Sequence, residues 1–408
     1  MIFRDKTVVP AMMFHSVGLE KANWVWSHIS EPVRVFEEKL VALRSKGYRS
    51  VTWEQLYQHM AGIQQLPKNS IFLTFDDGYL DNWVYVFPLL RKYELKGTIY
   101  INPDFVQREN TVRPNLDDVW SGHLSEPDLQ VQGFLTWEEM RLMESSGVID
   151  IQSHSLTHTW YFSGPQLQDY YRKEDTQRYP WMAWNLRPDR KPYYLSEDQS
   201  DFVEPGTPIF QHEKSLVVRK FVPDEKATEK IRKYIQSKGV ETFWKNDHWL
   251  VETMRTLGGW YPNGMPGTYE SDYDRISRVR FELQSSKEQI ERNLNKKVDY
   301  ICWPGGGNDE FVWRLAREVG YKSWTLGSQD KSEFRNSFDS DPETVKRIGS
   351  SNEVRVRSKY YGQGGALFME LKIGAHQKSL LYKLMVWIYK LCFIFKSRFW
   401  FGYFSREH

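Results

Sequence analysis

The chain has 408 residues, and its 55 basic and 53 acidic side chains give a formal net charge of only +2 at pH 7. This balance gives no reason to expect a nucleic acid or a strongly acidic partner. Only two cysteines occur, Cys302 and Cys392, which excludes a disulfide framework and a cysteine-based zinc site. Aromatic residues make up 15% of the chain, a share that suits stacking on sugar rings and aromatic-rich cores equally.

The first part of the chain predicts a strand and two helices. Residues 1–6 lack the apolar core of a secretion signal, so we expect a cytoplasmic protein. Residues 8–15 are typical of an apolar strand that ends on a histidine. Pro32 begins the first helix, and Thr52 with Gln55 forms a capping box for the second.

Two adjacent carboxylates follow a buried strand at residues 71–75. Neighbouring residues of a strand point to opposite faces, so Asp76 and Asp77 can share one site only if the strand ends there. Gly78 supplies a turn that permits this. Two buried carboxylates need a proton or a metal ion to offset their desolvation. The alternative interpretation is an ordinary exposed Asp-Asp-Gly turn.

Strands alternate with helices over much of the remaining chain. We expect strands at residues 98–101, 148–151, 298–303 and 321–326. We expect helices at residues 84–93, 136–146, 285–294 and 309–319, the last of them capped by Asn308. Residues 103–133 are expected to form an extended loop. This alternation predicts parallel βαβ units. About seven strands can be counted, which favours a barrel over an open sheet.

The alternation fails over residues 160–281, which we expect to be an insertion at the strand-end face. Its aromatic side chains include Trp160, Tyr161, Trp181, Trp184, Tyr193 and Tyr194. These rings suit sugar stacking, but a lid with its own small core is an equal alternative. We therefore assign none of them as a binding residue.

The end of the chain differs from the rest. Residues 380–404 are mostly apolar and aromatic, interrupted by Lys383, Lys390, Lys396 and Arg398. These charges recur too often for a membrane-spanning helix. The pattern is typical of an amphipathic helix at the surface of an anionic leaflet, and a final helix packed on the core is the alternative.

Two histidines provide candidate metal ligands. His154 and His158 lie four residues apart, directly after the strand expected at 148–151. The carboxyl ends of parallel barrel strands meet at one face, so these imidazoles can meet a carboxylate from residues 76–77. One carboxylate and two imidazoles hold a divalent metal ion and leave open positions for water and substrate. This is the layout of a catalytic site.

At this point two segments resemble a known family. Thr-Phe-Asp-Asp-Gly-Tyr at 74–79 and Ser-His-Ser-Leu-Thr-His at 153–158 resemble the first two motifs of the polysaccharide deacetylase family, also called NodB homology or carbohydrate esterase 4. Residues 282–291 and the Trp-Pro-Gly-Gly segment at 303–306 also resemble family features.

The resemblance, which covers about residues 1–160 and 281–350, implies an α/β fold, a distorted (β/α)7 barrel. On that basis we expect the barrel at 1–159 and 282–350, the insertion at 160–281, and a C-terminal extension at 351–408 with an amphipathic, membrane-interface helix.

The resemblance also implies roles for individual residues. Asp76 would be the general base. Asp77, His154 and His158 would hold a divalent metal ion, expected to be zinc. The backbone N–H near Gly305 would help to bind the oxyanion. Met-Phe-His-Ser-Val at 13–17 resembles the N-terminal motif of a circularly permuted branch that includes deacetylases of poly-N-acetylglucosamine. This implies that His15 is the general acid; the alternative is a buried histidine at a strand end.

Two departures from the family pattern stand out. Residues 301–303 are Ile-Cys-Trp where many members have an arginine that orients the base, so the orientation of Asp76 is left unexplained. No histidine lies between His248 and His376, where the acid usually occurs.

We expect an N-deacetylase that acts on an N-acetylated glycan or glycolipid, either a cell-surface glycan or its lipid-linked precursor at the inner membrane face. A decayed, non-catalytic glycan-binding protein is the alternative that the missing arginine suggests. A metal amidase acting on a non-sugar N-acyl substrate is a third interpretation.

Overall fold

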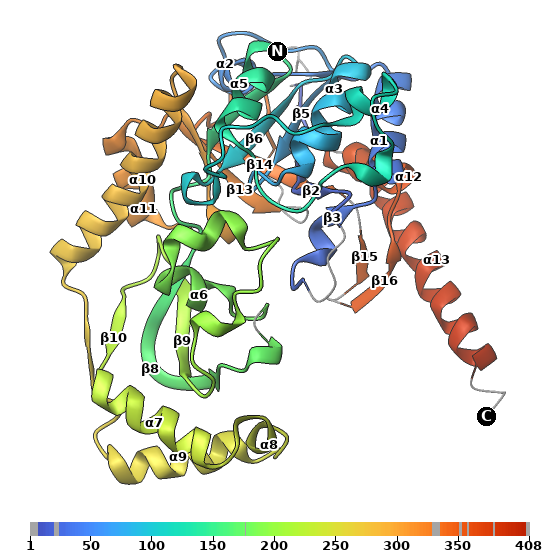
Figure 1. The fold of residues 1–408 in the computed structure, drawn as a ribbon. Helices are drawn as coiled ribbons and strands as arrows, with labels where there is room; N and C mark the ends of the chain where they lie inside the picture. The colour runs from blue at the N-terminus through green and yellow to red at the C-terminus, as the bar shows by residue number, and fades with distance from the viewer. Residues whose placement is uncertain are drawn as a thin grey trace.

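The computed structural model describes residues 7–19, 24–175, 177–328, 335–350, 353–356, 359–377 and 380–404. A barrel forms the body of the molecule, the insertion extends from it on one side, and a long C-terminal helix projects on the other (Figure 1). The expectation for residues 1–6 falls outside the described residues, as do the side chains of Lys396 and Arg398.

Seven parallel strands form the closed barrel. They are β1 (Ala11–Phe14), β5 (Ser70–Phe75), β6 (Gly97–Ile101), β7 (Ile149–Ser153), β12 (Tyr300–Cys302), β13 (Ser323–Ser328) and β14 (Thr344–Gly349). The order β1-β14-β13-β12-β7-β6-β5 closes where β1 pairs with β5, with Met12 opposite Leu73. The short β4 (Arg49–Ser50) pairs in parallel with the first two residues of β5, Ser70 and Ile71. The expected (β/α)7 barrel is therefore confirmed.

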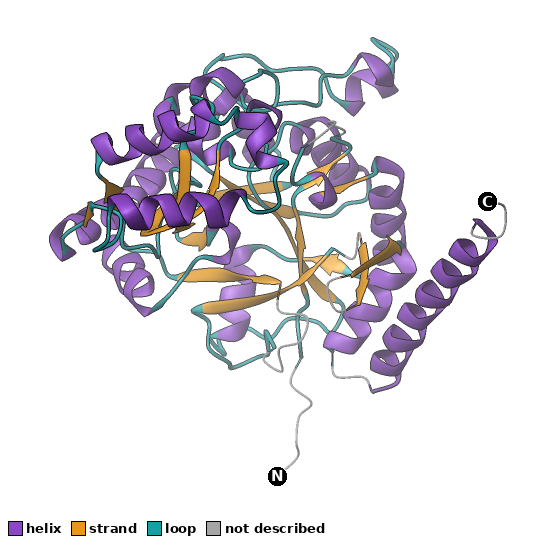
Figure 2. Ribbon diagram, turned by 90° about the horizontal axis from the view of Figure 1, so that it is seen from below, coloured by secondary structure: helices purple, strands orange, loops and turns teal. Residues whose placement is uncertain are grey.

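Helices surround the barrel, as the view from below shows (Figure 2). They are α1 (Val33–Ser45), α2 (Trp53–Met60), α3 (Phe87–Lys92), α4 (Leu116–Trp120), α5 (Trp137–Ser145), α10 (Asp272–Leu294) and α11 (Glu310–Val319). All six residues of β5 are buried, because helices and strands cover it on both faces. The capping box of Thr52 with Gln55 is present, and so is that of Thr136 with Glu139.

Several boundaries differ from those expected. Residues 103–133 are not simply an extended loop, because they contain α4 and two single 3-10 turns. A π-helical turn at Asn82–Val86 precedes α3. Helix α10 begins at Asp272, well before residue 285. Asp309, and not Asn308, caps α11: its side chain accepts a hydrogen bond from the backbone N–H of Val312 at 2.9 Å.

The insertion leaves the barrel after β7. Its elements are β8 (Trp160–Tyr170), α6 (Pro180–Leu186), β9 (Pro208–Lys214), β10 (Phe221–Pro223), α7 (Glu225–Ser237), α8 (Val240–Trp244), α9 (Trp249–Trp260) and β11 (Gly267–Tyr269). The antiparallel pair β8–β9 is its backbone, and α7, α8 and α9 lie at the end remote from the barrel (Figure 1). Strand β11 returns the chain to α10.

The C-terminal extension packs on the barrel beside α1. It contains the antiparallel pair β15 (Glu353–Val356) and β16 (Lys359–Gln363), then α12 (Ala366–His376) and α13 (Leu380–Phe404). One side of α13 packs on α12, where the ring of Tyr389 stacks on Phe368 with centroids 4.9 Å apart. Within the described part of the chain, no helix has both the length and the apolar character needed to span a membrane.

Candidate active site

The two adjacent carboxylates stand at the carboxyl end of β5. This strand ends at Phe75, and both Asp77 and Gly78 have a positive φ, of 76° and 69°. The resulting turn lets Asp76 and Asp77 line the same cavity. A Cβ at Gly78 would lie 2.8 Å from the side chain of Ile101, so the turn requires glycine. Because Asp76 is only 3% exposed, the alternative of an exposed turn does not apply.

Two imidazoles converge on Asp77. The Nε2 atoms of His154 and His158 lie 3.2 and 3.3 Å from Asp77 Oδ1. A tetrahedral site with metal–ligand bonds of about 2.0–2.1 Å places its ligand atoms about 3.3 Å apart. Asp77 Oδ1 is also buried and accepts no hydrogen bond from the described residues. These three side chains, which sequence reasoning selected, therefore fit a divalent metal ion.

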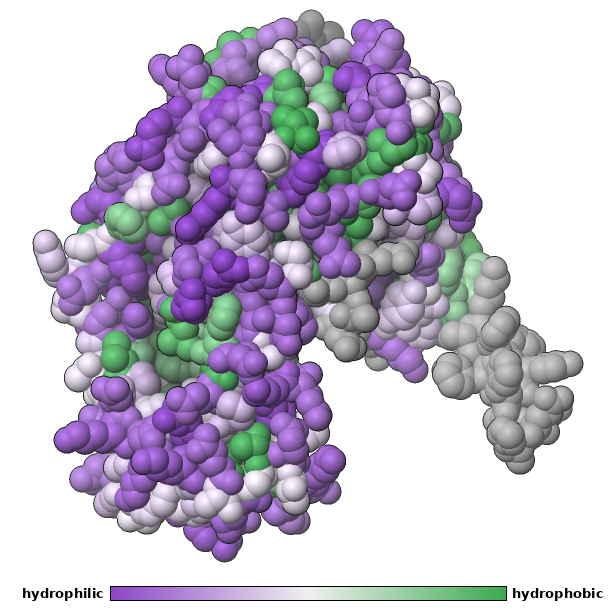
Figure 3. All heavy atoms as spheres, viewed as in Figure 1, coloured by the Kyte–Doolittle hydropathy of each residue, from purple (hydrophilic) through white to green (hydrophobic). Residues whose placement is uncertain are grey.

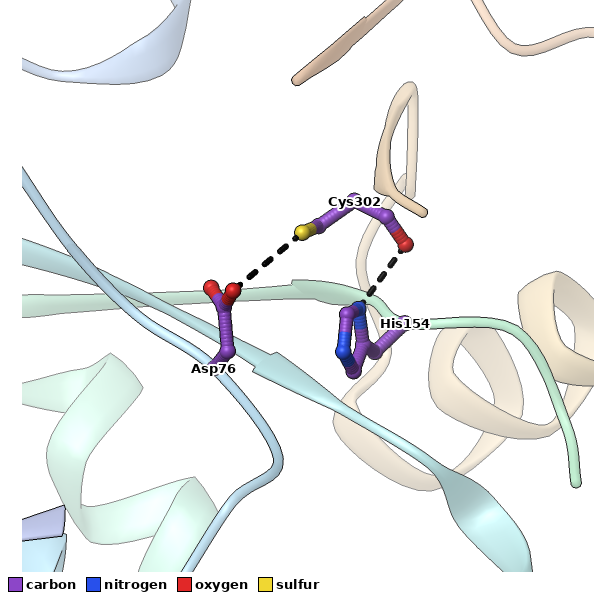
Figure 4. Close-up of side chains that lie close together, drawn as sticks. All are labelled: Asp76, His154 and Cys302. Atoms are coloured by element: carbon purple, nitrogen blue, oxygen red, sulfur yellow. Dashed lines mark hydrogen bonds between the residues drawn. The ribbon is translucent and has the colours of Figure 1, made fainter. Parts of the chain in front are cut away.

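The tautomer of His154 supports this fit. Its Nδ1 donates a hydrogen bond to the backbone carbonyl of Cys302 at 2.8 Å (Figure 4). A carbonyl oxygen can only accept, so Nδ1 carries the hydrogen and the neutral ring has its lone pair on Nε2. A metal-ligating histidine is commonly held in this way by a backbone carbonyl behind it.

The loop that carries the two imidazoles is tightly constrained. Ser155 and His158 have positive φ values of 60° and 42°, which are uncommon outside glycine. The side chain of Asn102, at the end of β6, donates hydrogen bonds to the backbone carbonyls of His154 and Ser155. A tight loop, and not a helical turn, thus brings the two histidines to one side.

The insertion also supports this loop, through Lys191. The Lys191 ammonium donates a hydrogen bond to the carbonyl of Thr157 at 2.9 Å and pairs with Asp104 at 2.9 Å. Lys191 is only 2% exposed. From the other side, the hydroxyl of Thr157 donates to Glu282 of α10 at 2.7 Å. The barrel and the insertion therefore fix the position of the same loop.

Asp76 stands beside this triad and is held by Arg347 of β14. The guanidinium donates two parallel hydrogen bonds to the carboxylate, at 2.6 and 2.8 Å. Burial alone would raise the pKa of Asp76, but Arg347 holds it below its usual value. Cys302 Sγ lies 3.5 Å from the same carboxylate (Figure 4) and 3.0 Å from Arg347 Nη2.

Arg347 therefore accounts for the orientation of Asp76, which the sequence left unexplained. Residues 301–303 contribute Cys302 to this position, and the guanidinium comes from β14 instead. Sequence reasoning missed Arg347, Cys302 and Asn102. The available signal for Arg347 was a single arginine inside the strand-like run Thr-Val-Lys-Arg-Ile-Gly at 344–349.

His15 follows β1 and lies on the other side of Asp76. Its Nε2 is 3.7 Å from Asp76 Oδ2, and its side chain is 21% exposed. Its backbone carbonyl accepts a hydrogen bond from the Asn82 side chain at 3.0 Å. Burial lowers the pKa of His15, while the neighbouring carboxylates oppose this shift. The ring is therefore within the site and is not a fully buried histidine of the strand end.

All six residues predicted from the sequence line one cavity of about 320 Å³: His15, Asp76, Asp77, His154, His158 and Gly305. Gly305 and Gly306 follow β12 with φ values of 54° and 73°. Aromatic rings from the insertion complete the wall, including Trp160, Trp184 and Tyr194, whereas Tyr161, Trp181 and Tyr193 do not line the cavity.

The fold and the site define a class: a seven-stranded parallel barrel with an Asp-His-His cluster and a second, arginine-held carboxylate beside it. Residues 63–187 match the family model described as polysaccharide deacetylase. This match covers less than a third of the chain, and the curated relatives that match the chain carry deacetylase names.

Two curated relatives match part of the chain. YxkH of Bacillus subtilis (strain 168), named provisionally as a polysaccharide deacetylase, is 27% identical over 150 residues, 37% of this chain and 43% of its own length. The poly-β-1,6-N-acetyl-D-glucosamine N-deacetylase of Escherichia coli (strain K12) is 25% identical over 145 residues, 36% of this chain and 20% of its own length. The matches thus span less than half of either relative.

Two solved structures share the fold. The BpsB deacetylase domain from Bordetella bronchiseptica aligns with a TM-score of 0.50 and 17% identity, over 84% of this chain and 96% of that domain. A de-N-acetylase from Aggregatibacter actinomycetemcomitans aligns with the same TM-score and identity, over 83% of this chain and 94% of that one. At this identity, the likeness supports the barrel architecture alone.

A further buried carboxyl, Asp81, lies behind His15. It accepts hydrogen bonds from the Ser16 hydroxyl and, at 2.7 Å, from the Asn82 side chain. Burial nevertheless raises its pKa to about 7. The folded protein therefore holds a proton on Asp81 at pH values where the unfolded chain, with a pKa near 3.8, has lost it.

We predict that this proton makes stability depend on pH. The contribution of Asp81 is complete below pH 4 and is lost as the pH rises through about 7, because the folded state then carries a buried charge. Between pH 5 and 8 the free energy of unfolding should fall by about 2–3 kcal/mol from this group. In urea unfolding, the free energy of unfolding of Asp81→Asn should not show this decrease between pH 5 and 8. The control Asp189→Asn changes an exposed carboxylate and should keep the decrease. A wild-type pH dependence of the free energy of unfolding in Asp81→Asn would contradict the assignment of this proton to Asp81.

Proposed function

We propose that this protein is a metal-dependent N-deacetylase that hydrolyses the acetamide of an N-acetylated sugar. One observation carries the proposal: the Asp77, His154 and His158 cluster shares a cavity with a separate carboxylate, Asp76, that Arg347 fixes in place. The match of residues 63–187 to the polysaccharide deacetylase model and the N-deacetylase activity named for the Escherichia coli relative support it. One carboxylate and two imidazoles at tetrahedral spacing favour zinc as the ion.

The proposed reaction consumes one water and yields acetate and a free amine. When bound, the metal ion supplies a Lewis acid that polarises the amide carbonyl and lowers the pKa of a coordinated water. Asp76 accepts a proton from the attacking water as the new C–O bond forms. The backbone N–H of Gly305 stabilises the developing oxyanion. His15 donates a proton to the nitrogen as the C–N bond breaks.

The decisive experiment measures acetate release from N-acetylated lipid-linked and nucleotide-linked sugars, with the metal content of the protein determined in parallel. We expect release from at least one sugar of this panel. Metal-loaded protein that releases acetate from none of them would contradict the proposal. Release from simple N-acyl amides alone would favour the non-sugar amidase, since the same groups can hydrolyse any amide that reaches them.

We predict that the metal depends on the imidazole pair. His154→Ala removes one ligand and the hydrogen bond behind it, so purified protein should lose about one equivalent of bound zinc and its acetate release. The control His123→Ala changes an exposed histidine, with a side chain 73% accessible, and should keep both. Chelation of the wild type should abolish release, and added zinc should restore it. Full metal content in His154→Ala would contradict the ligand assignment.

We also propose that the substrate is the lipid-linked precursor of a cell-surface glycan, reached at a membrane surface. Helix α13 supports this. Its exposed apolar side chains are Leu380, Leu381, Leu384, Met385, Trp387, Ile388 and Phe395. In Figure 3 most of the visible surface is hydrophilic, and the coloured part of α13 at the right carries apolar side chains. A contiguous apolar face of this kind marks an interaction surface.

Charge favours an anionic bilayer as the partner of this face. The sequence has no acidic residue between Glu370 and Glu407, but Lys378, Lys383 and Lys390 occur in this stretch. Lysines that flank an apolar helix face are typical of helices that lie in the interface of anionic membranes. The negative surface potential of the cytoplasmic leaflet makes the inner membrane face the proposed location.

We predict that the protein floats with anionic phospholipid vesicles and less with neutral ones. The variant Leu384→Glu/Ile388→Glu places two charges on the exposed face and should lower the floated fraction at least about tenfold, because charged side chains insert at high cost. Ile63→Glu changes an apolar residue that is 72% exposed elsewhere, so it is the matched control. Equal flotation of both variants would contradict membrane contact through α13. If the wild type and Ile63→Glu form dimers and the α13 variant does not, this face binds a second copy of the chain instead.

A further inference from the structure

The glycine-rich turn after β12 carries the predicted oxyanion donor. Gly305 and Gly306 have φ values of 54° and 73°, and both line the cavity. The N–H of Gly306 donates a hydrogen bond to the carbonyl of Trp303 at 3.0 Å, and the N–H of Gly307 donates to that of Pro304 at 3.0 Å. A donor stabilises an oxyanion only if it is held where the charge develops. The contacts that support this turn therefore matter for the proposed reaction.

The side chain of Lys214, at the end of β9, lies along this turn. A Cβ added at Gly305 would lie 3.0 Å from Lys214 Cε. One added at Gly307 would lie 2.7 Å from Lys214 Cδ and 2.9 Å from Lys214 Cβ. Gly307 has a φ of −74°, outside the left-handed region, so its backbone conformation does not require glycine. The close approach of Lys214 requires it instead, and the insertion thus packs directly on the turn.

The aliphatic stem of Lys214 makes this contact, and its ammonium does not. The ammonium pairs with Glu213 at 3.0 Å, and the Lys214 side chain is 30% exposed. Lysine commonly buries its methylene groups along a surface while its charge stays in water. The atoms nearest to the glycines are Cβ, Cγ, Cδ and Cε, so the contact is van der Waals packing. An uncharged side chain of similar length should therefore replace it.

The residues after Lys214 are fixed to α10 of the barrel. The Arg278 guanidinium donates hydrogen bonds to the backbone carbonyls of Ser215 and Val218, at 2.5 and 3.0 Å. The Ser215 hydroxyl donates to Glu282 at 3.1 Å. The carbonyl of Lys214 accepts a hydrogen bond from the N–H of Val218 at 3.1 Å. Residues 214–218 therefore link α10 to the glycine-rich turn.

We infer that Lys214 is a positioning residue for the oxyanion donor. This inference rests on the proposed function and adds a residue of the insertion to it. The stem of Lys214 fills the space beside Gly305 and Gly307 and limits the movement of the turn, so the N–H of Gly305 stays where the reaction needs it. Oxyanion stabilisation acts in the transition state, so the effect belongs to kcat and not to KM.

The kinetic test compares two variants of Lys214, as metal-loaded protein, on a sugar of the panel that releases acetate. Lys214→Ala removes the stem and should lower kcat by about 10–100-fold with little change in KM, because a displaced reactive group costs up to about 10²-fold. Lys214→Met keeps a stem of similar length without the charge and should retain nearly the wild-type kcat. Lys233→Ala is the matched control, since this lysine of α7 has a side chain that is 72% exposed.

Three kinetic results would overturn the inference. The first is a wild-type kcat in Lys214→Ala. The second is a loss of kcat in Lys214→Met as large as in Lys214→Ala, which would show that the charge acts. The third is a wild-type kcat in Gly307→Ala, because a Cβ at that position should displace the turn from the other side of the same contact.

Amide hydrogen exchange measures the support of the turn without turnover. The peptide that contains Gly306 and Gly307 should exchange faster in Lys214→Ala than in the wild type, because its hydrogen bonds open more often. It should exchange at the wild-type rate in Lys214→Met and Lys233→Ala. Unchanged exchange in Lys214→Ala would contradict the packing role. If exchange responds but the wild type releases acetate from no sugar of the panel, the proposed function fails and the inference with it.

Discussion

Asp76→Asn should lower kcat for acetate release by about 10²–10⁴-fold, the range for loss of a general base. The amide keeps the shape of the carboxylate but cannot take a proton from water. Asp77, His154 and His158 are unchanged, so the bound metal should remain at the wild-type level. The measurement pairs single-substrate kinetics with metal analysis of the same preparation.

This variant also separates the enzyme from a non-catalytic glycan-binding protein. A binding protein would show the same ligand affinity and the same absence of turnover in the wild type and in Asp76→Asn. An enzyme loses turnover in the variant while its substrate affinity changes little, since Asp76 acts on water. Wild-type kcat in Asp76→Asn would show that another group is the base.

Arg347→Met should both destabilise the fold and reduce activity. Arg347 and Asp76 are 1% and 4% exposed at their side chains, and removal of the guanidinium leaves a buried carboxylate without its ion-pair partner. Loss of one partner of a buried pair costs about 3–5 kcal/mol of unfolding free energy. The carboxylate then escapes part of this cost by binding a proton, which removes the base. Urea unfolding and kinetics on the same variant measure both effects.

A double-mutant cycle distinguishes the ion pair from simple loss of packing. Asp76→Asn/Arg347→Met removes both charges, so it should recover much of the stability that Arg347→Met loses. Arg317→Met breaks a surface pair with Glu343, whose side chains are 46% and 31% exposed, and should change stability by about 1 kcal/mol or less. A double variant that is less stable than Arg347→Met would contradict the ion-pair explanation.

The sequence predicted the barrel and most of the site because both depend on local patterns. Apolar strands separated by helices indicate parallel βαβ units, and the ends of such strands meet at one face whatever their separation in sequence. This geometry was enough to place Asp76, Asp77, His154 and His158 together. The turn at Gly78 could also be predicted, because glycine adopts a positive φ without strain.

Arg347 could not be found in this way. It lies 271 residues from Asp76 along the chain, and its contact depends on the register of β14 in the closed barrel. No local pattern encodes that register. The contact of Trp26 with Trp160 and Trp184 was also beyond sequence reasoning, because it joins the segment after β1 to the insertion, far apart in the sequence. Such contacts depend on tertiary packing, which propensity and periodicity do not describe.

The hydrogen bond from Lys191 to Thr157 has a practical consequence for trimming or transplanting this protein. A shortened version that joined residue 159 to α10 would keep every predicted metal ligand, yet it would lose the ammonium that holds the histidine loop from outside the barrel. We expect such a minimal barrel to hold the two imidazoles less firmly and to bind a metal ion less tightly. We therefore expect the insertion to contribute to metal retention through Lys191, so a chimera that uses this barrel should include Lys191 as well.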